Sequence, residues 1–301
     1  MAEMNKISKE VESDLQQYRE AFKASIDYCR PQFEAYLRFY KLWRGIKPPE
    51  MDATLSNIWI NIFHSIVNNR LPLIFENVFS NPDYLTLKSD SPEYDLMADG
   101  AQAWIRDLLN DKIKIRSDAM ATVQSALIGG TGYRMPYVRY VERDGKQVPV
   151  VSSKNLNFFN VFPSPNGSTV NPSDYHEESG VDWMLVVDWW SEDKIKGEAK
   201  REGFNESEID RMFDDQNGGP RRYDEDNYKD QFKQVNGMNY EGYGAQYDKL
   251  SGDKPDTLNK RRVVHWFRRD VHMIVAEDAY LIYKGDPYMG KGTIPVVPIN
   301  N

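Results

Sequence analysis

The sequence contains little cysteine and little histidine, which narrows the chemistry open to it. Cys29 is the single cysteine among 301 residues, so no disulfide can form within the chain and a cysteine-rich zinc module is excluded. A reducing compartment suits such a composition. Six residues separate His265 from His272, and no H-E-x-x-H pattern or carboxylate cluster accompanies them. We interpret these two histidines as ordinary strand residues rather than as a metal-binding pair.

Long apolar runs are also lacking. A transmembrane helix needs about 20 predominantly apolar residues, and the nearest candidate, residues 57–79, is interrupted by Asn61, His64 and Arg70 and contains Pro72. We interpret this segment as a core or interface helix and predict no membrane association. The N-terminal segment is charged and has no apolar centre of the kind that a secretory signal peptide requires.

An excess of positive charge is absent as well. The chain has 38 Lys and Arg residues against 46 Asp and Glu residues, a formal net charge of -8. Proteins that bind duplex DNA tightly neutralise phosphates with basic side chains, so this balance makes the chain a poor candidate for a static DNA clamp, although it is compatible with a protein that lies beside DNA. Hydrophobic residues make up 40% of the chain and aromatic residues 13%, which predicts a soluble globular protein.

The glycine motifs of nucleotide-binding proteins are missing too. Residues 125–138 read SALIGGTGYRMPYV, yet neither G-x-G-x-x-G nor G-x-x-x-x-G-K-[ST] is matched. In phosphate-binding loops the glycines follow a strand and open a helix, whereas here they follow a predicted helix and precede a predicted strand. The sequence therefore predicts that Gly129 or Gly130 is the left-handed C-cap of a helix.

Apolar residues at spacings of three and four predict several helices. An N-terminal helical arm is expected over residues 1–50, with a first helix ending at Pro31 and a second piece reaching Trp43. Further helices are expected over about residues 55–76 and 92–128. Tyr84, Leu85 and Leu87 predict a short strand between them.

Antiparallel strands are predicted in the remainder of the chain. Asp144-Gly145 is a two-residue turn signal between alternating runs, and a second turn is expected at Glu277-Asp278. A small helical pair is expected after the strand VDWMLVVDWW, with Ser191 and Asn205 as N-caps. The predicted fold class is α+β, with a helical arm and long helices packed with antiparallel β-hairpins.

The predicted domain organisation has four segments. They are the arm (1–50), an α+β region (51–213), a long flexible polar loop (214–258) and a final group of strands (259–301). The loop is assigned from its composition, which is rich in Gly, Asn, Asp and Tyr and poor in aliphatic residues.

No residue stands out as catalytic, cofactor-binding or metal-binding. The nucleophile elbow G-x-S-x-G does not occur, and no histidine lies near Cys29 in sequence. Asp224, Asp226 and Asp230 do not follow the EF-hand pattern. The sequence therefore predicts a protein that is not an enzyme and needs no cofactor.

The order of these elements resembles the N-terminal, wing part of tailed-bacteriophage portal proteins, over about residues 56–298. The likeness is carried by segments that follow one another in the expected order: NIWINIFHSIVNNRLPLIFEN with NPDYLTLKS, SALIGGTGYRMPYV, NFFNVFPSP, VDWMLVVDWWSEDKI, RVVHWFRRD and AYLIYKGDPYMGKGTIPVVP. Two departures accompany it. The strand NFFNVFPSPNGS lacks an Asp-Pro often found there, and the stem, clip and crown that follow a portal wing have no counterpart, so we expect the chain to be part of a longer protein.

The resemblance implies a virion protein, assembled in the host cytoplasm and placed at the capsid portal vertex. Its copies would form a homo-oligomeric ring, a dodecamer in this family, through which double-stranded DNA passes without sequence-specific binding. The implied partners are the major capsid protein, the terminase and a tail adaptor.

Such a ring predicts subunit contacts through aromatic-rich helical surfaces. The candidate contact residues are Trp43, Trp59, Phe63 and Trp104. Two alternatives stay open from the sequence: another head–tail adaptor or structural virion protein without a channel, and a hydrolase that binds a metal through Asp and Glu alone.

Overall fold

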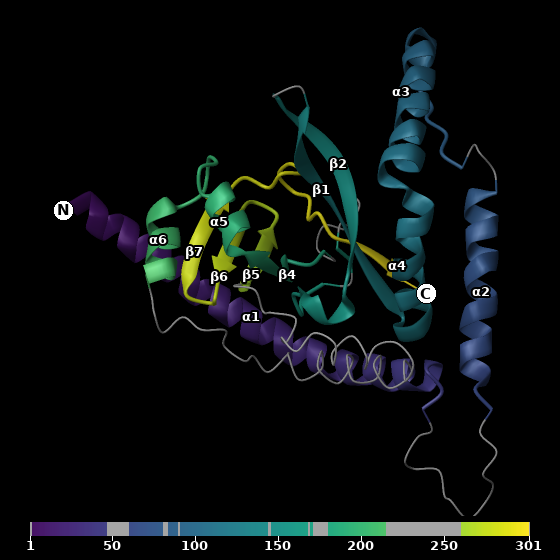
Figure 1. The fold of residues 1–301 in the computed structure, drawn as a ribbon, viewed down its shortest axis with the longest axis horizontal. Helices are drawn as coiled ribbons and strands as arrows, with labels where there is room; N and C mark the ends of the chain where they lie inside the picture. The colour runs from purple at the N-terminus through teal and green to yellow at the C-terminus, as the bar shows by residue number, and fades with distance from the viewer. Residues whose placement is uncertain are drawn as a thin grey trace, which may run out of the picture. The chain divides into compact units, whose positions relative to one another are not determined.

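The computed structural model has the α+β fold that the sequence predicts (Figure 1). It describes residues 2–46, 60–80, 84–89, 91–143, 146–167, 169–170, 180–214 and 260–300. The α-helices are α1 (Ala2–Trp43), α2 (Ile62–Phe79), α3 (Asp95–Asp107), α4 (Ile115–Gly129), α5 (Glu192–Glu198) and α6 (Glu206–Asp214). The strands are β1 (Thr131–Arg143), β2 (Lys146–Leu156), β3 (Val161–Pro163), β4 (Trp183–Ser191), β5 (Lys260–Arg268), β6 (His272–Ala276), β7 (Tyr280–Gly285) and β8 (Val297–Asn300).

The chain forms two compact units, each built from two separated stretches of sequence. The first unit comprises Met1–Leu37 and Phe159–Pro295, and the second comprises Arg38–Phe158 and Val296–Asn301. The predicted flexible loop, residues 214–258, lies outside the described residues except for its first position.

The first unit is an antiparallel sheet with strand order β3-β4-β5-β6-β7. Helix α1 covers one face, where Tyr18 packs edge-on against Trp266 at a ring-centroid distance of 6.0 Å. Helices α5 and α6 cover the other face, where Ile195 and Ile209 pack with Val263 in one buried cluster. Because both faces are covered, the central strands β5 and β6 read as nearly continuous apolar runs rather than as an alternation.

Helix α1 does not end at Pro31, so that prediction is wrong. The helix continues to Trp43 with Pro31 inside it. Proline removes one backbone hydrogen bond and normally kinks a helix, but the apolar face of α1 runs straight past this point. Cys29 and Phe33 are both buried, and the ring of Phe33 lies 5.3 Å from that of Phe159. Burial on both sides of the proline offsets the lost hydrogen bond.

The second unit contains a sheet with strand order β2-β1-β8 and the helices α2, α3 and α4. Strands β1 and β2 pair from Tyr133 to Arg143, with Val138 opposite Val151, as the predicted hairpin requires. The turn residues Asp144 and Gly145 themselves lie outside the described residues. Helix α4 packs on this hairpin, and the hydroxyl of Thr122 donates to Oδ1 of Asn155 over 2.9 Å.

The glycines after α4 turn the chain, as predicted. Gly130 is the C-cap in the left-handed conformation with φ 91°, and its N–H donates to the carbonyl of Ala126 over 2.8 Å. Gly132 lies near the start of β1, at a position that has no room for a side chain. A Cβ atom at this position would lie 2.1 Å from the carbonyl oxygen of Thr122.

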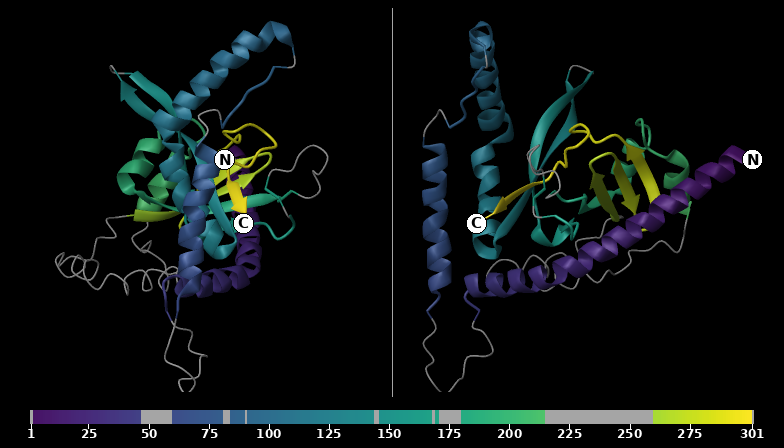
Figure 2. Two further views of the ribbon diagram at one scale, coloured as in Figure 1. Left: turned by 90° about the vertical axis from the view of Figure 1, so that its right-hand side faces the viewer. Right: turned by 180° about the vertical axis from the view of Figure 1, so that it is seen from behind.

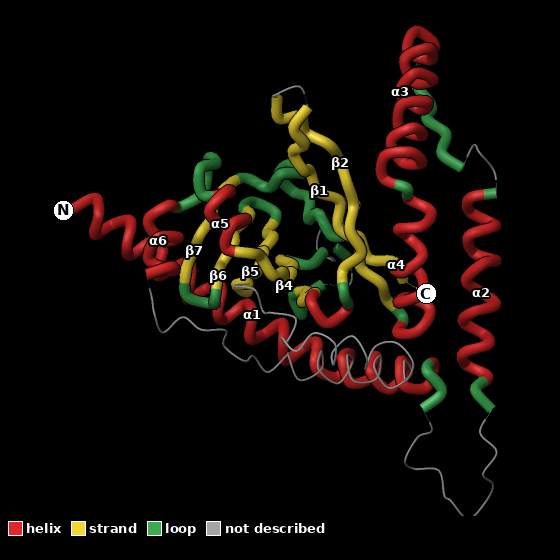
Figure 3. The backbone as a smooth tube through the Cα atoms, viewed as in Figure 1, coloured by secondary structure: helices red, strands yellow, loops and turns green. Residues whose placement is uncertain are grey.

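The predicted single helix over residues 92–128 is wrong, because four pieces occupy this stretch. A 3-10 turn (Pro92–Tyr94) precedes α3, and a π-helical segment (Leu108–Ile113) lies between α3 and Lys114, which precedes α4. Lys114 is left-handed, with φ 55° and ψ 49°, and Figure 3 shows the resulting break between the two helices. Asn110 and Asp111, at this point, are poor helix formers.

The strand expected around Tyr84–Leu87 is also wrong. Residues 84–89 pair with no strand, and their backbone groups bond to side chains of α3 instead. The N–H of Leu87 donates to Oε1 of Gln102 over 2.7 Å, and Nη2 of Arg106 donates to the carbonyl of Leu85 over 3.1 Å. These side chains replace a neighbouring strand as hydrogen-bond partners.

Candidate subunit interface

Helix α2 has apolar side chains on opposite sides, and only one side is covered. Val67 and Phe75 are buried on the side that packs against α4. The other side carries Ile62, Ile66 and Leu73, which are 63%, 48% and 57% exposed. At 100° per residue these three positions lie within about 40° of one another around the helix axis. We call them the outer α2 stripe.

An exposed apolar stripe also runs along α3. Met97 and Trp104 are 70% and 62% exposed, and they lie seven residues apart with exposed Ala101 between them. This spacing places all three on one side of the helix; we call them the outer α3 stripe. The other side of α3 bonds to residues 84–89, and no residue of α3 is buried. Figure 2 shows α2 and α3 as long helices within the second unit.

These two stripes are exposed apolar features of the helices in the second unit. A soluble helix normally keeps one apolar face and turns it to the core, while a helix that is apolar on all sides is buried by a neighbour. Single exposed apolar residues need no explanation, but contiguous ones mark contact surfaces. The two stripes are therefore candidates for a contact surface.

The residues nominated from the sequence occupy different places in the second unit. The backbone carbonyl of Trp43 accepts a hydrogen bond from Nδ2 of Asn61 over 3.0 Å. The indole ring of Trp43 stacks on the ring of His64, with a distance of 5.5 Å between the ring centroids. Phe63 is partly buried, with its ring 6.3 Å from that of Phe39. Both side chains therefore join the end of α1 to the start of α2, and only a part of each is left for an outside contact.

Trp104 is the one nominated residue that stands fully on an exposed surface, and Trp59 lies outside the described residues. Sequence reasoning missed Ile62, Ile66, Leu73 and Met97. The available signal was the distribution of apolar residues on more than one side of α2, which an ordinary amphipathic helix does not show.

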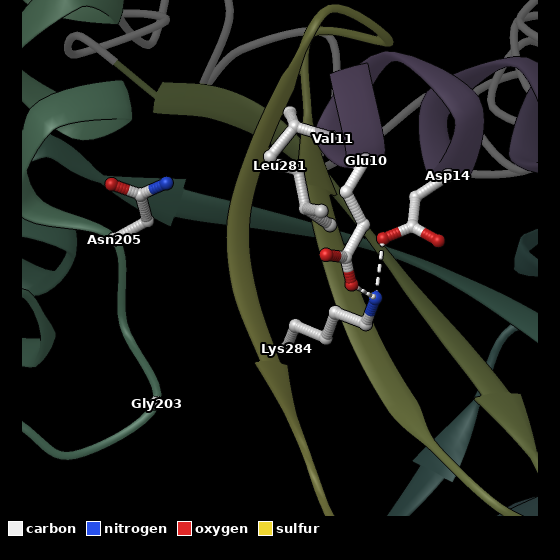
Figure 4. A pocket seen from close by; sticks show the side chains of 7 residues that line it. All are labelled: Glu10, Val11, Asp14, Gly203, Asn205, Leu281 and Lys284. Atoms are coloured by element: carbon white, nitrogen blue, oxygen red, sulfur yellow. Dashed lines mark hydrogen bonds and ion pairs between the residues drawn. The ribbon is translucent and has the colours of Figure 1, made fainter. Parts of the chain in front are cut away.

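A small pocket lies in the first unit, between α1, β7 and the segment before α6 (Figure 4). Its volume is about 210 Å³, and it is lined by Glu10, Val11, Asp14, Gly203, Asn205, Leu281 and Lys284. Nζ of Lys284 lies 2.6 Å from Oδ2 of Asp14 and 3.1 Å from Oε1 of Glu10. Burial lowers the pKa of Lys284, but the hydrogen bonds to Asp14 and Glu10 outweigh it and raise the pKa. The amine therefore stays protonated and is no nucleophile.

His265 and His272 are strand residues, as interpreted from the sequence, and they meet across β5 and β6. Nδ1 of His265 lies 3.3 Å from Nε2 of His272. Burial lowers the pKa of His272 to about 3, so its ring is neutral near pH 7. Within the described ranges, no group of three or more His, Cys, Asp or Glu side chains is placed to hold a metal ion.

Cys29 is buried on the packed face of α1. Burial raises the pKa of its thiol to about 12, and the protonated thiol is a poor nucleophile. In the part of the chain that the structure describes, no helix is both long and apolar enough to cross a lipid bilayer.

No protein-family model matches this sequence, and no curated protein matches it significantly.

Proposed function

We propose that this protein is a structural subunit that assembles with copies of itself into a ring, in the manner of a tailed-bacteriophage portal protein. The observation that carries the proposal is the pair of exposed apolar stripes on α2 and α3. Burying such stripes against copies of the chain removes apolar surface from water, and this is the main driving force of subunit association.

The proposed setting is the portal vertex of a virion. The ring would let double-stranded DNA pass during packaging and ejection, and it would contact the major capsid protein, the terminase and a tail adaptor. A net charge of -8 favours this role because a channel that binds phosphates weakly does not retain the DNA. These partners follow from the ordered sequence resemblance.

The test is the mass and shape of the purified chain. Light scattering after size exclusion should give a defined multiple of the 35.0 kDa subunit mass, and negative-stain images should show a ring with a central hole. A closed oligomer without a hole would overturn the channel and favour an adaptor. A monomer at every concentration measured would overturn the proposal as a whole.

A further inference from the structure

Resting on the proposed function, we infer that the outer α2 stripe of one copy packs against the outer α3 stripe of the next copy. The occupant of each stripe is thus a second copy of this chain, and the contact is head-to-tail. Contacts between two different surfaces continue from subunit to subunit, and they form a ring when the rotation closes.

The presence of two separate stripes favours this pairing over symmetric ones. If α2 stripes paired with each other, Met97 and Trp104 would stay in water in every copy. If α3 stripes paired with each other, the apolar side chains on α2 would stay exposed instead. Pairing α2 with α3 covers both stripes of every subunit with one type of contact, which buries the most apolar surface.

The charges on the two helices favour the same pairing. Helix α3 carries three exposed carboxylates, which belong to Asp95, Asp99 and Asp107. Its one basic residue, Arg106, is engaged with the carbonyl of Leu85. Two α3 helices would therefore repel each other, because like charges at an interface are unfavourable.

Helix α2 offers the complementary cation. Arg70 is exposed and lies three residues before Leu73, at the side of the outer α2 stripe, while Asp107 lies three residues after Trp104, at the side of the outer α3 stripe. A contact between the two stripes brings a basic and an acidic flank to the same interface.

Cysteine cross-linking tests the pairing directly. One chain carries Ile66→Cys and a second, with a tag that changes its size, carries Ala101→Cys; the two are co-expressed and oxidised. Cys29 is buried with a protonated thiol, so it contributes little background. We expect a mixed dimer band at least tenfold stronger than any band from either variant oxidised alone.

The outcomes separate this inference from the proposed function. Cross-linking of Ile66→Cys alone, or of Ala101→Cys alone, at the strength of the mixture would overturn the head-to-tail pairing. A ring whose mixture gives no cross-link would overturn the pairing and leave the ring intact. A monomeric parent protein would overturn both.

Charged substitutions give a second test with a matched control. Ile66→Lys and Trp104→Lys each place an ammonium group in the contact, so each should abolish the ring, because burying an unpaired charge is costly. Gln17→Lys adds the same charge at an exposed position of α1 in the first unit and should leave the ring unchanged. Circular dichroism should show that all three variants fold. If the Trp104→Lys variant still forms the ring, α3 is not part of the interface.

Discussion

Nη1 of Arg262, whose side chain is completely buried, donates a hydrogen bond to Oδ1 of Asp278 over 2.7 Å. The hydroxyl of Tyr18 donates to the same carboxylate oxygen, and Arg19 donates to the backbone carbonyl of Asp278. One turn residue thus holds a buried cation on β5 and two side chains of α1. The hydrogen bonds from Tyr18 and Arg19 link the long helix to the sheet of the first unit.

Replacing Asp278 should be strongly destabilising. Asp278→Asn keeps a residue that tolerates the left-handed backbone at φ 55° but removes the charge opposite Arg262. The substitution removes one anionic partner of the buried guanidinium, so we expect a loss of about 2 kcal/mol in the free energy of unfolding measured in urea. Asp270→Asn, which weakens the exposed pair with Arg268, is the control and should cost less than about 1 kcal/mol. Equal effects of the two variants would contradict this account.

Stability should fall in mild acid because of His272. Its folded-state pKa of about 3 lies below the ordinary value of 6.5. Between these two pH values the imidazole is protonated in the unfolded chain and neutral in the folded protein. The stabilising contribution is present above pH 6.5 and is lost as the pH falls toward 3, at up to about 1.4 kcal/mol per pH unit. The measurement is urea unfolding between pH 7.5 and 5.5 for the parent and for His272→Phe. The variant should lose stability less steeply, and parallel curves would argue against a buried neutral ring.

The joint between α4 and β1 should not accept a methyl group. Gly132→Ala places a Cβ atom against the backbone oxygen of Thr122, which cannot move aside as a flexible side chain can. We expect a loss of about 2–3 kcal/mol in unfolding free energy. Gly197→Ala is the matched control, because its Cβ atom meets nothing within 4 Å in helix α5. That change should stabilise the protein by about 0.5–1 kcal/mol, since alanine favours the helix. The same sign for both substitutions would show that the contact is looser than described.

Pro31→Ala should stabilise the protein. Alanine restores a backbone N–H inside α1 and removes the clash of the proline ring with the preceding turn. It also gives the unfolded chain more conformational freedom, which offsets part of this gain. We expect a net increase of about 1–2 kcal/mol in the free energy of unfolding. Gln17→Ala changes an exposed position of the same helix without a proline and should alter stability by less than about 0.5 kcal/mol. An unchanged or lower stability of Pro31→Ala would show that the proline does not destabilise α1.

The features that the sequence predicted well are decided by neighbouring residues. Ser191 accepts a hydrogen bond from the N–H of Lys194 over 3.3 Å, and Asn205 accepts one from the N–H of Glu208 over 3.4 Å. Both caps depend only on a residue three positions away. The C-cap at Gly130 likewise expresses the backbone preference of glycine for the left-handed region.

The features that the sequence predicted poorly are decided by distant residues. Pro31 stays helical because Phe33 packs against Phe159, more than a hundred positions away. The segment around Leu85 forms no strand because α3 satisfies its backbone groups. The candidate interface shows the same limit. Spacing places Ile66 and Val67 on different sides of α2, but only the packing of α4 decides which side is left in water.

The break at Lys114 separates α3 from the better-packed α4. Helix α3 is 13 residues long and has no buried residue, and an isolated helix of this length is only marginally stable in water. Its amide protons should therefore exchange with solvent far sooner than those of α4 in a free subunit, and should become protected once a neighbour arrives. In the proposed ring, the ordering of α3 would then be coupled to the binding of the neighbouring subunit.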